Sequence, residues 1–196
     1  MQVQAGSCDT PLLPFTNILS DGGAYDEEFG PHNLFQEESQ ICYCSLRRSS
    51  INVTAQLEGL GCFMLASIEL RTPSLGYTSP LGQAILFTSF GRPDVAATKR
   101  FDEVFSEREY REQVAEMQAQ PPERPSSPGL EVPTPASFVY TSSDRVTAQL
   151  DVPRAGRWIL LKLLRPREPS GDNIDVQFVG CRGWRGARCF GAADAC

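Results

Sequence analysis

The stretch from Trp158 to Leu164 reads WILLKLL, with Lys162 as its only charged residue. A run this apolar is typical of a central strand, which is covered by protein on both faces. The segments before and after it, residues 146–150 and 174–178, alternate apolar and polar side chains instead. That period of two indicates strands with only one buried face. The second half of the chain therefore predicts β-structure.

The same two patterns recur in the first half of the chain. Residues 51–57 alternate, residues 62–70 and 81–90 are more continuously apolar, and residues 137–141 form a further short run. Turn residues such as those at 73–76 separate the runs. About seven short strands with one minor helix predict a mainly β, antiparallel sandwich or barrel.

One helix is signalled, from about Ser106 to Gln118. Residues 106–109, SERE, have the sequence of a capping box, and Phe105 and Tyr110 have the spacing of a hydrophobic staple. Residues 118–137 carry six prolines among Ser, Glu and Gly, which predicts a flexible proline-rich insertion. We expect one domain over residues 1–196, because the roughly 60 residues after the insertion are near the lower limit for independent folding.

The composition of the chain limits the classes of function that we expect for it. The chain has 196 residues and a formal net charge of −6, which argues against general nucleic-acid binding. It has no apolar run long enough for a membrane span and no signal-peptide pattern at its start, so we expect a cytoplasmic or nuclear protein. Its seven cysteines, an odd number, favour buried thiols without disulfides.

Two segments resemble the discoidin-type, galactose-binding-like domains. Residues 32–45, HNLFQEESQICYCS, resemble the opening segment of that family, and residues 173–180, NIDVQFVG, are similar to its final strand. The resemblance implies an antiparallel jelly roll of about eight strands that binds through loops at one end of the sandwich. With no signal pattern, it implies the intracellular, Doc-like branch, whose members act in ubiquitin-ligase or ciliary assemblies.

No catalytic constellation is evident, and we expect a protein that is not an enzyme and has no cofactor. His32 is the only histidine, and its position after a Gly-Pro pair favours a turn role over a catalytic one. The cysteines lack the spacing of a structural zinc site, so no metal site is predicted. The acidic run 21–28 offers oxygen ligands for calcium, but it does not fit the twelve-residue calcium loop, and a solvated acidic turn is the favoured interpretation.

The segment 180–188, GCRGWRGAR, is the most unusual in the chain. Arginine forks bind carboxylates and tryptophan anchors interfaces, so this segment is a candidate protein-binding surface; the alternative is a structural role for both residue types. The leading hypothesis is an adaptor that recognises a protein partner. The alternative is a carbohydrate- or small-ligand-binding, lectin-like domain with aromatics such as Tyr77 or Phe90 at its site. The candidate binding residues are Arg182, Trp184, Arg185, Arg188, His32 and Tyr77.

Overall fold

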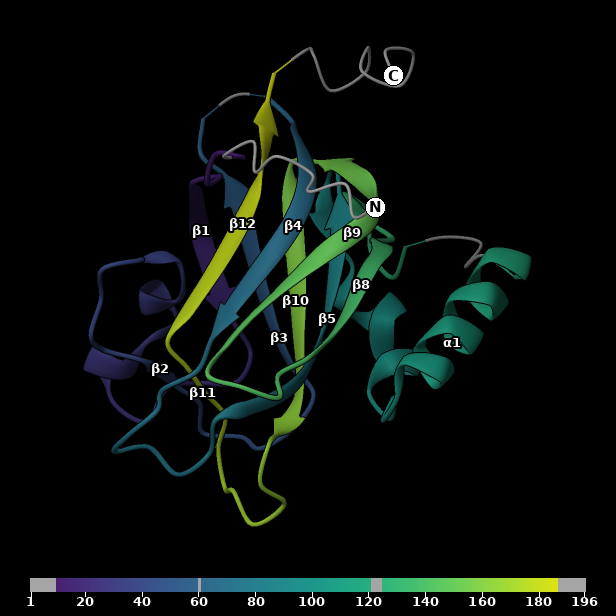
Figure 1. The fold of residues 1–196 in the computed structure, drawn as a ribbon. Coiled ribbons are helices and arrows are strands. Elements are labelled where there is room, and N and C mark those ends of the chain that lie inside the picture. The colour runs from purple at the N-terminus through teal and green to yellow at the C-terminus, as the bar shows by residue number, and fades with distance from the viewer. Residues whose placement is uncertain (1–9, 60, 121–124, 187–196) are drawn as a thin grey trace, which may run out of the picture.

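The protein is a sandwich of two antiparallel sheets with a helix on one side (Figure 1). A computed structural model describes residues 10–59, 61–120 and 125–186. The larger sheet has five strands in the order β1-β3-β10-β5-β8, and the smaller has three in the order β12-β4-β9. These eight strands confirm the predicted mainly β, antiparallel jelly-roll sandwich.

The strands of the larger sheet are β1 (Phe15–Ser20), β3 (Ile51–Leu57), β10 (Trp158–Pro166), β5 (Leu81–Ser89) and β8 (Thr134–Tyr140). Those of the smaller sheet are β12 (Phe178–Arg185), β4 (Phe63–Arg71) and β9 (Arg145–Gly156). Two short ribbons pair β2 (Tyr43–Cys44) with β11 (Asp175–Val176), and β6 (Arg92–Pro93) with β7 (Leu130–Glu131). The helical elements are η1 (Glu27–Phe29), η2 (Pro31–Phe35), η3 (Val95–Phe101) and α1 (Glu107–Ala119).

The main core lies between the two sheets. In β3 and β10 the antiparallel register sets Val53 opposite Leu161 and Ile51 opposite Leu163, and all four side chains are buried. Apolar side chains of β4 belong to the same cluster. The alternating pattern of residues 51–57 therefore marks the face that β3 turns toward the smaller sheet.

A second apolar cluster covers the outer face of the larger sheet. Leu160 and Leu164 of β10 and Phe87 of β5 pack there against two further side chains. These are Phe101, the last residue of η3, and Val104, three residues later. The partly buried stripe of α1, Tyr110, Val114 and Met117, lies on this cluster. Because both faces of β5 and β10 are buried, their sequences are continuously apolar rather than alternating.

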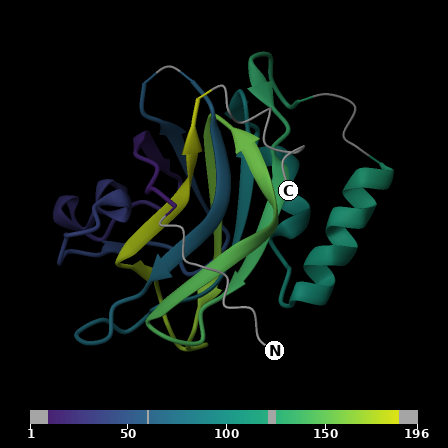
Figure 2. The ribbon, with the colours of Figure 1, turned by 45° about the horizontal axis from the view of Figure 1, so that its top comes forward.

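The helix α1 begins as the sequence predicts. The Ser106 hydroxyl accepts from the Glu109 amide at 3.3 Å, and the Glu109 carboxylate accepts from the Phe105 amide at 2.7 Å. Figure 2 shows α1 on the opposite side of the sandwich from η1 and η2. Among the described residues, no helix is long and apolar enough to cross a membrane.

Only part of the predicted insertion, residues 118–137, is loop in the ranges that the structure describes. Gln118 lies within α1, and residues 130–131 and 134–137 lie within β7 and β8. Ser126 is also held, because its amide donates to the Asp94 carboxylate at 2.6 Å. Proline-rich composition misled the prediction because Pro133 and Pro135 are buried against the sheet rather than exposed.

The predicted strand 174–178 is divided in the structure. Asp175 and Val176 pair with β2, whereas Phe178 begins β12, which runs on to Arg185 beside β4. The last strand is therefore longer than the sequence pattern indicates. Glycines at 180 and 183 obscure the alternation there.

Candidate functional site

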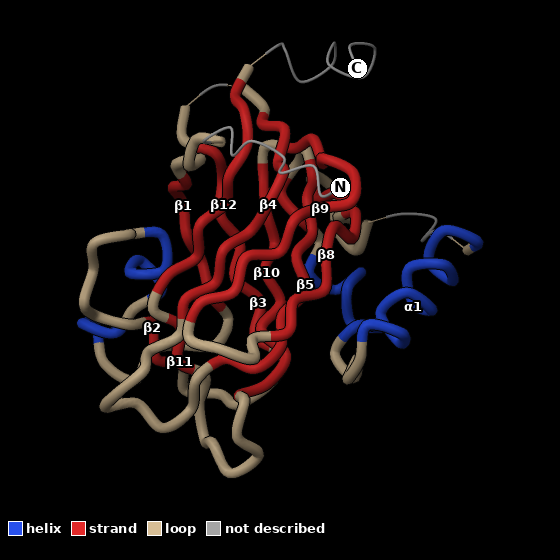
Figure 3. The backbone as a smooth tube through the Cα atoms, in the orientation of Figure 1, coloured by secondary structure: helices blue, strands red, loops and turns tan. Residues whose placement is uncertain are grey.

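A cleft of about 550 Å³ opens at one end of the sandwich. We call this the loop end; it is formed by residues 45–50, 72–80, 141–144 and 167–174, and the long loops gather there in Figure 3. The volume lies within the range of about 300–1,000 Å³ that is usual for small-ligand sites. Residues from three segments line the cleft. They are Arg48, Ser49 and Ser50; Asp102, Glu103 and Phe105; and Leu164, Arg165, Pro166, Arg167 and Pro169.

Phe105 and Arg165 form the aromatic part of the cleft. Phe105 stands between η3 and α1, and 59% of its surface is exposed. The guanidinium carbon of Arg165, at the end of β10, lies 3.5 Å from the centre of the Phe105 ring. One face of the ring is thus occupied by a planar cation.

Arg165 is held by the Phe105 ring and by a hydrogen bond to the backbone. Its Nη2 donates to the Val104 carbonyl at 2.8 Å, whereas its buried Nε has no hydrogen-bond partner among the described residues. Burial lowers the pKa of the Arg165 guanidinium, while the charge of Glu109 acts in the opposite direction. A buried N–H without an acceptor is costly, and this atom is closed off from the cleft as well as from solvent.

Ser50 adopts a backbone conformation that is unusual for a residue with a side chain. Its φ is +51°, in the left-handed region. Its amide donates to the Leu164 carbonyl at 3.2 Å and its hydroxyl donates to the Asp102 carbonyl at 3.2 Å. Such strain costs of order 1 kcal/mol or more and persists where neighbouring contacts fix it, often at binding sites.

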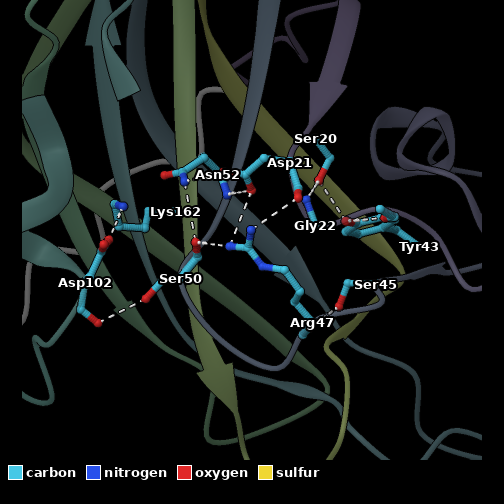
Figure 4. Close-up of polar contacts among 11 residues, drawn as sticks. Ser20, Asp21, Gly22, Tyr43, Ser45, Arg47, Ser50, Asn52, Asp102 and Lys162 are labelled. Atoms are coloured by element: carbon cyan, nitrogen blue, oxygen red, sulfur yellow. Dashed lines mark hydrogen bonds and ion pairs between the residues drawn. The ribbon is translucent and has the colours of Figure 1, made fainter. Parts of the chain in front are cut away.

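A polar network holds the loop that carries Arg48, Ser49 and Ser50 (Figure 4). Arg47 donates to the Ser50 carbonyl at 2.9 Å and lies 3.8 Å from the Asp21 carboxylate. Asp21 in turn accepts from the Asn52 amide and from the Asn52 side chain, both at 2.8 Å. The wall of the cleft is therefore anchored to β3.

Asp102 is fixed by the buried lysine of the central strand. Lys162, 1% exposed, lies opposite Asn52 on the outer face of the larger sheet, and its ammonium binds the Asp102 carboxylate (Figure 4). The pair explains the one charge in the WILLKLL run, because a buried charge requires a partner. Lys162 thereby holds one side of the cleft to the sheet.

Two further arginines join the loops around the cleft. Arg167 is fully engaged, since it donates to the carbonyls of Thr141 and Ser143 and to the Thr72 hydroxyl, and pairs with Asp144 at 3.4 Å. Arg48 is exposed and donates one hydrogen bond, to the Pro169 carbonyl at 3.0 Å. Arg48 therefore keeps donors for a ligand, whereas Arg167 has a structural role.

The sequence-predicted residues of the last strand lie elsewhere. Trp184 and Arg185 pair with Met64 and Phe63 at the end of the sandwich opposite the loop end. Trp184 is 46% exposed, and Arg185 binds the Glu58 carbonyl. Arg182 lies 3.8 Å from the buried Glu69 carboxylate. Arg182 and Arg185 thus form no ion pair with the acidic run 21–28 within the described ranges, and Arg188 lies outside them.

The other two predicted binding residues, His32 and Tyr77, lie apart from those of β12. His32 is exposed in η2, on the side of the molecule away from α1. Tyr77 lies in a loop at the loop end, where burial and then its hydrogen bond with Cys42 raise the pKa of its phenol. Neither residue lines the cleft. The five predicted binding residues that the structure describes therefore do not converge on one site.

Most cysteines and acidic side chains of the described ranges have structural partners or are buried. They contain no group of three or more His, Cys, Asp or Glu side chains placed to hold an ion. Cys42, Cys44 and Cys181 are buried without disulfides, and burial raises the pKa of Cys181 to about 12. In the acidic run, Asp21 binds Asn52 and Asp26 caps η1. The buried thiols of Cys42, Cys44 and Cys181 are unreactive at neutral pH.

A second cleft, also of about 550 Å³, lies over the outer face of β3, beside the end of β1. Its lining includes Asn52, Thr54 and Asp94 but no aromatic side chain. The Asp94 carboxylate there is already used by Ser126 and the Ala96 amide. The cleft at the loop end, which adds an aromatic ring and two arginines with spare donors, is therefore the stronger candidate.

Sequence reasoning missed Phe105, Arg165, Arg48 and Asp102 as site residues. It assigned Phe105 to the helix staple, whereas Tyr110 packs against Phe101 and Phe138. The available signal was a large aromatic residue directly before a capping box. The side chain of this residue is not part of the apolar core. Nothing in the sequence joins that residue to Arg165.

No family model matches the sequence, and no curated protein matches it. The similarity lies in the structure: the chain has the discoidin-like, galactose-binding-like fold, which confirms the resemblance at the level of the fold.

The particular neighbours are carbohydrate-binding modules of family 32. CpGH89CBM32-5 from Clostridium perfringens, solved with GalNAc-β-1,3-galactose, is 9% identical over 88% of this chain and 100% of its own, with a TM-score of 0.57. The module of Streptococcus pneumoniae EndoD is 9% identical over 86% and 97%, with a TM-score of 0.54. The module of C. perfringens NanJ, solved with galactose, is 8% identical over 84% and 92%, with a TM-score of 0.51.

Proposed function

We propose that the protein is a non-catalytic carbohydrate-binding module whose site is the cleft at the loop end. The observation that carries the proposal is the half-exposed ring of Phe105, set among polar side chains that are fixed to the sheet. A sugar ring offers an apolar C–H face to an aromatic side chain and hydroxyl groups to charged or amide groups. The binding partners of the structural neighbours are consistent with this class of ligand.

The rigidity of the cleft supports a binding role. Ser50 is held by Leu164 and Asp102, and Asp102 is held by Lys162. Side chains fixed before the ligand arrives lose little entropy on binding. The residues around the cleft are therefore suited to recognition.

The adaptor hypothesis remains a prediction. It rests on Trp184 and the arginines of β12, at the other end of the sandwich, and the structural neighbours do not favour it. An intracellular location and membership in a ubiquitin-ligase or ciliary assembly are likewise predictions. They do not bear on the sugar site itself.

A glycan array with the labelled full chain tests the proposal. We expect binding to a defined set of glycans, loss of this binding in Phe105→Ala, and no change in Phe90→Ala. Phe90 is the matched control, because it is a 45% exposed aromatic at the end opposite the loop end. The proposal is wrong if no glycan binds, or if Phe90→Ala abolishes binding while Phe105→Ala leaves it intact.

A further inference from the structure

The cleft at the loop end carries an excess of positive charge that its own residues do not neutralise. Asp102 is paired with Lys162, and Arg167 is paired with Asp144. Within the described ranges, no carboxylate lies within ion-pair distance of Arg48 or Arg165. Two guanidinium groups thus face the cleft, in a chain whose formal net charge is −6.

The two guanidinium groups also have hydrogen-bond donors to spare. Each donates one bond to a backbone carbonyl, Arg48 to Pro169 and Arg165 to Val104. Guanidinium groups bind carboxylates through paired N–H···O bonds that a neutral hydroxyl cannot match.

The remaining charge that lines the cleft does not cancel this excess. Glu103 and Arg48 are both exposed to solvent, which screens their charges alike, and the charge of Glu109 acts on Arg165 without lying within ion-pair distance of it. Arg165, in contrast, is partly buried under Phe105, where electrostatic interactions are stronger. The electrostatics of the cleft therefore favour an anion.

We infer that the cleft selects sugars that carry a carboxylate, such as uronic or sialic acids, over the corresponding neutral sugars. This inference rests on the proposed function and narrows its ligand class. The apolar face of the sugar lies against Phe105, and the carboxylate accepts from Arg165 and Arg48.

Matched sugar pairs test the inference by isothermal titration. The pairs are the methyl glycosides of galacturonic acid and galactose, those of glucuronic acid and glucose, and N-acetylneuraminic acid and its methyl ester. We expect the acid of at least one pair to bind about tenfold more tightly than its neutral partner at low salt. The difference should shrink as sodium chloride is added, because salt screens the charges.

Two arginine variants locate the effect. Arg48→Gln and Arg165→Gln should each reduce the preference for the acid to within about threefold, whereas Arg108→Gln, on the exposed face of α1, should leave it unchanged. Arg48 is exposed, so its variant should fold even if Arg165→Gln does not. Circular dichroism checks the fold of each.

The outcomes separate the two proposals. Neutral sugars that bind as tightly as their acids overturn the inference but leave the proposed function standing. A preference for acids that survives both variants also overturns it. The absence of any binding, on the array and in titration, overturns both.

Discussion

The guanidinium group of Arg165 lies 3.5 Å over the ring of Phe105, and this contact joins the end of β10 to the start of α1. It brings a strand of the sandwich and an inserted helix together at the mouth of the cleft. The contact is a consequence of the second apolar cluster, which fixes η3 and α1 on the outer face of the larger sheet.

Replacing Phe105 by Leu should separate recognition from stability. The variant keeps an apolar side chain but loses the ring face, so we expect sugar binding to weaken about tenfold. The free energy of unfolding should change by less than about 1 kcal/mol, because an exposed cation–π contact contributes roughly 0.5–1 kcal/mol. Titration and urea unfolding measure the two effects. Unchanged binding would contradict the role of the ring.

The pair of Lys162 and Asp102 should behave as a buried ion pair. Asp102→Ala leaves the buried Lys162 ammonium without a carboxylate, which typically costs about 3–5 kcal/mol. The lower end is expected, since the Asp102 side chain is 34% exposed. Lys162→Met combined with Asp102→Asn should recover most of the loss, because no charge stays buried. Urea unfolding of the two variants checks this, and equal losses in both would contradict it.

Glu69 should contribute to acid unfolding. Burial by itself raises the pKa of Glu69, but the hydrogen bond from Arg71 and the charges of Arg71 and Arg145 outweigh it, so the pKa is lowered. An unfolded glutamate titrates near pH ~4.3. The stabilisation is therefore present above that pH and is lost as the pH falls through the lower folded value.

Glu69→Gln should accordingly reduce stability at neutral pH and flatten the loss of stability below about pH 4. Urea midpoints measured across that range provide the test. Glu38→Gln, at an exposed position, is the control and should keep the acid slope of the wild type. A Glu69→Gln slope identical to the wild type would show that Glu69 does not couple to folding.

Trp184→Ala should separate the two sequence-based hypotheses for β12. A fully buried tryptophan costs about 3–5 kcal/mol when truncated, but Trp184 is 46% exposed. We expect a loss well below that range, with sugar binding unchanged because Trp184 lies at the opposite end from the cleft. Thermal melting and titration measure both. A large loss of stability would assign Trp184 to the structure and end its candidacy as a protein-binding residue.

The sequence alone determined the class of fold and the positions of most strands. Residues 51–57 form β3 as predicted, and WILLKLL lies within β10 at the centre of the larger sheet. These predictions succeeded because side-chain periodicity reports directly on which faces of a strand are buried. The capping box succeeded for a similar reason, since its hydrogen bonds join residues three positions apart.

Only the tertiary structure decided where the candidate site lies. Phe105, Arg165 and Arg48 come from three separate segments, and their approach depends on the order of strands and on the packing of η3 against β5 and β10. Likewise, Lys162 looked like an isolated charge until Asp102 was placed beside it. Local pattern specifies how a segment folds, but contacts between distant segments follow from the packing of the whole sandwich, which no single stretch of sequence encodes.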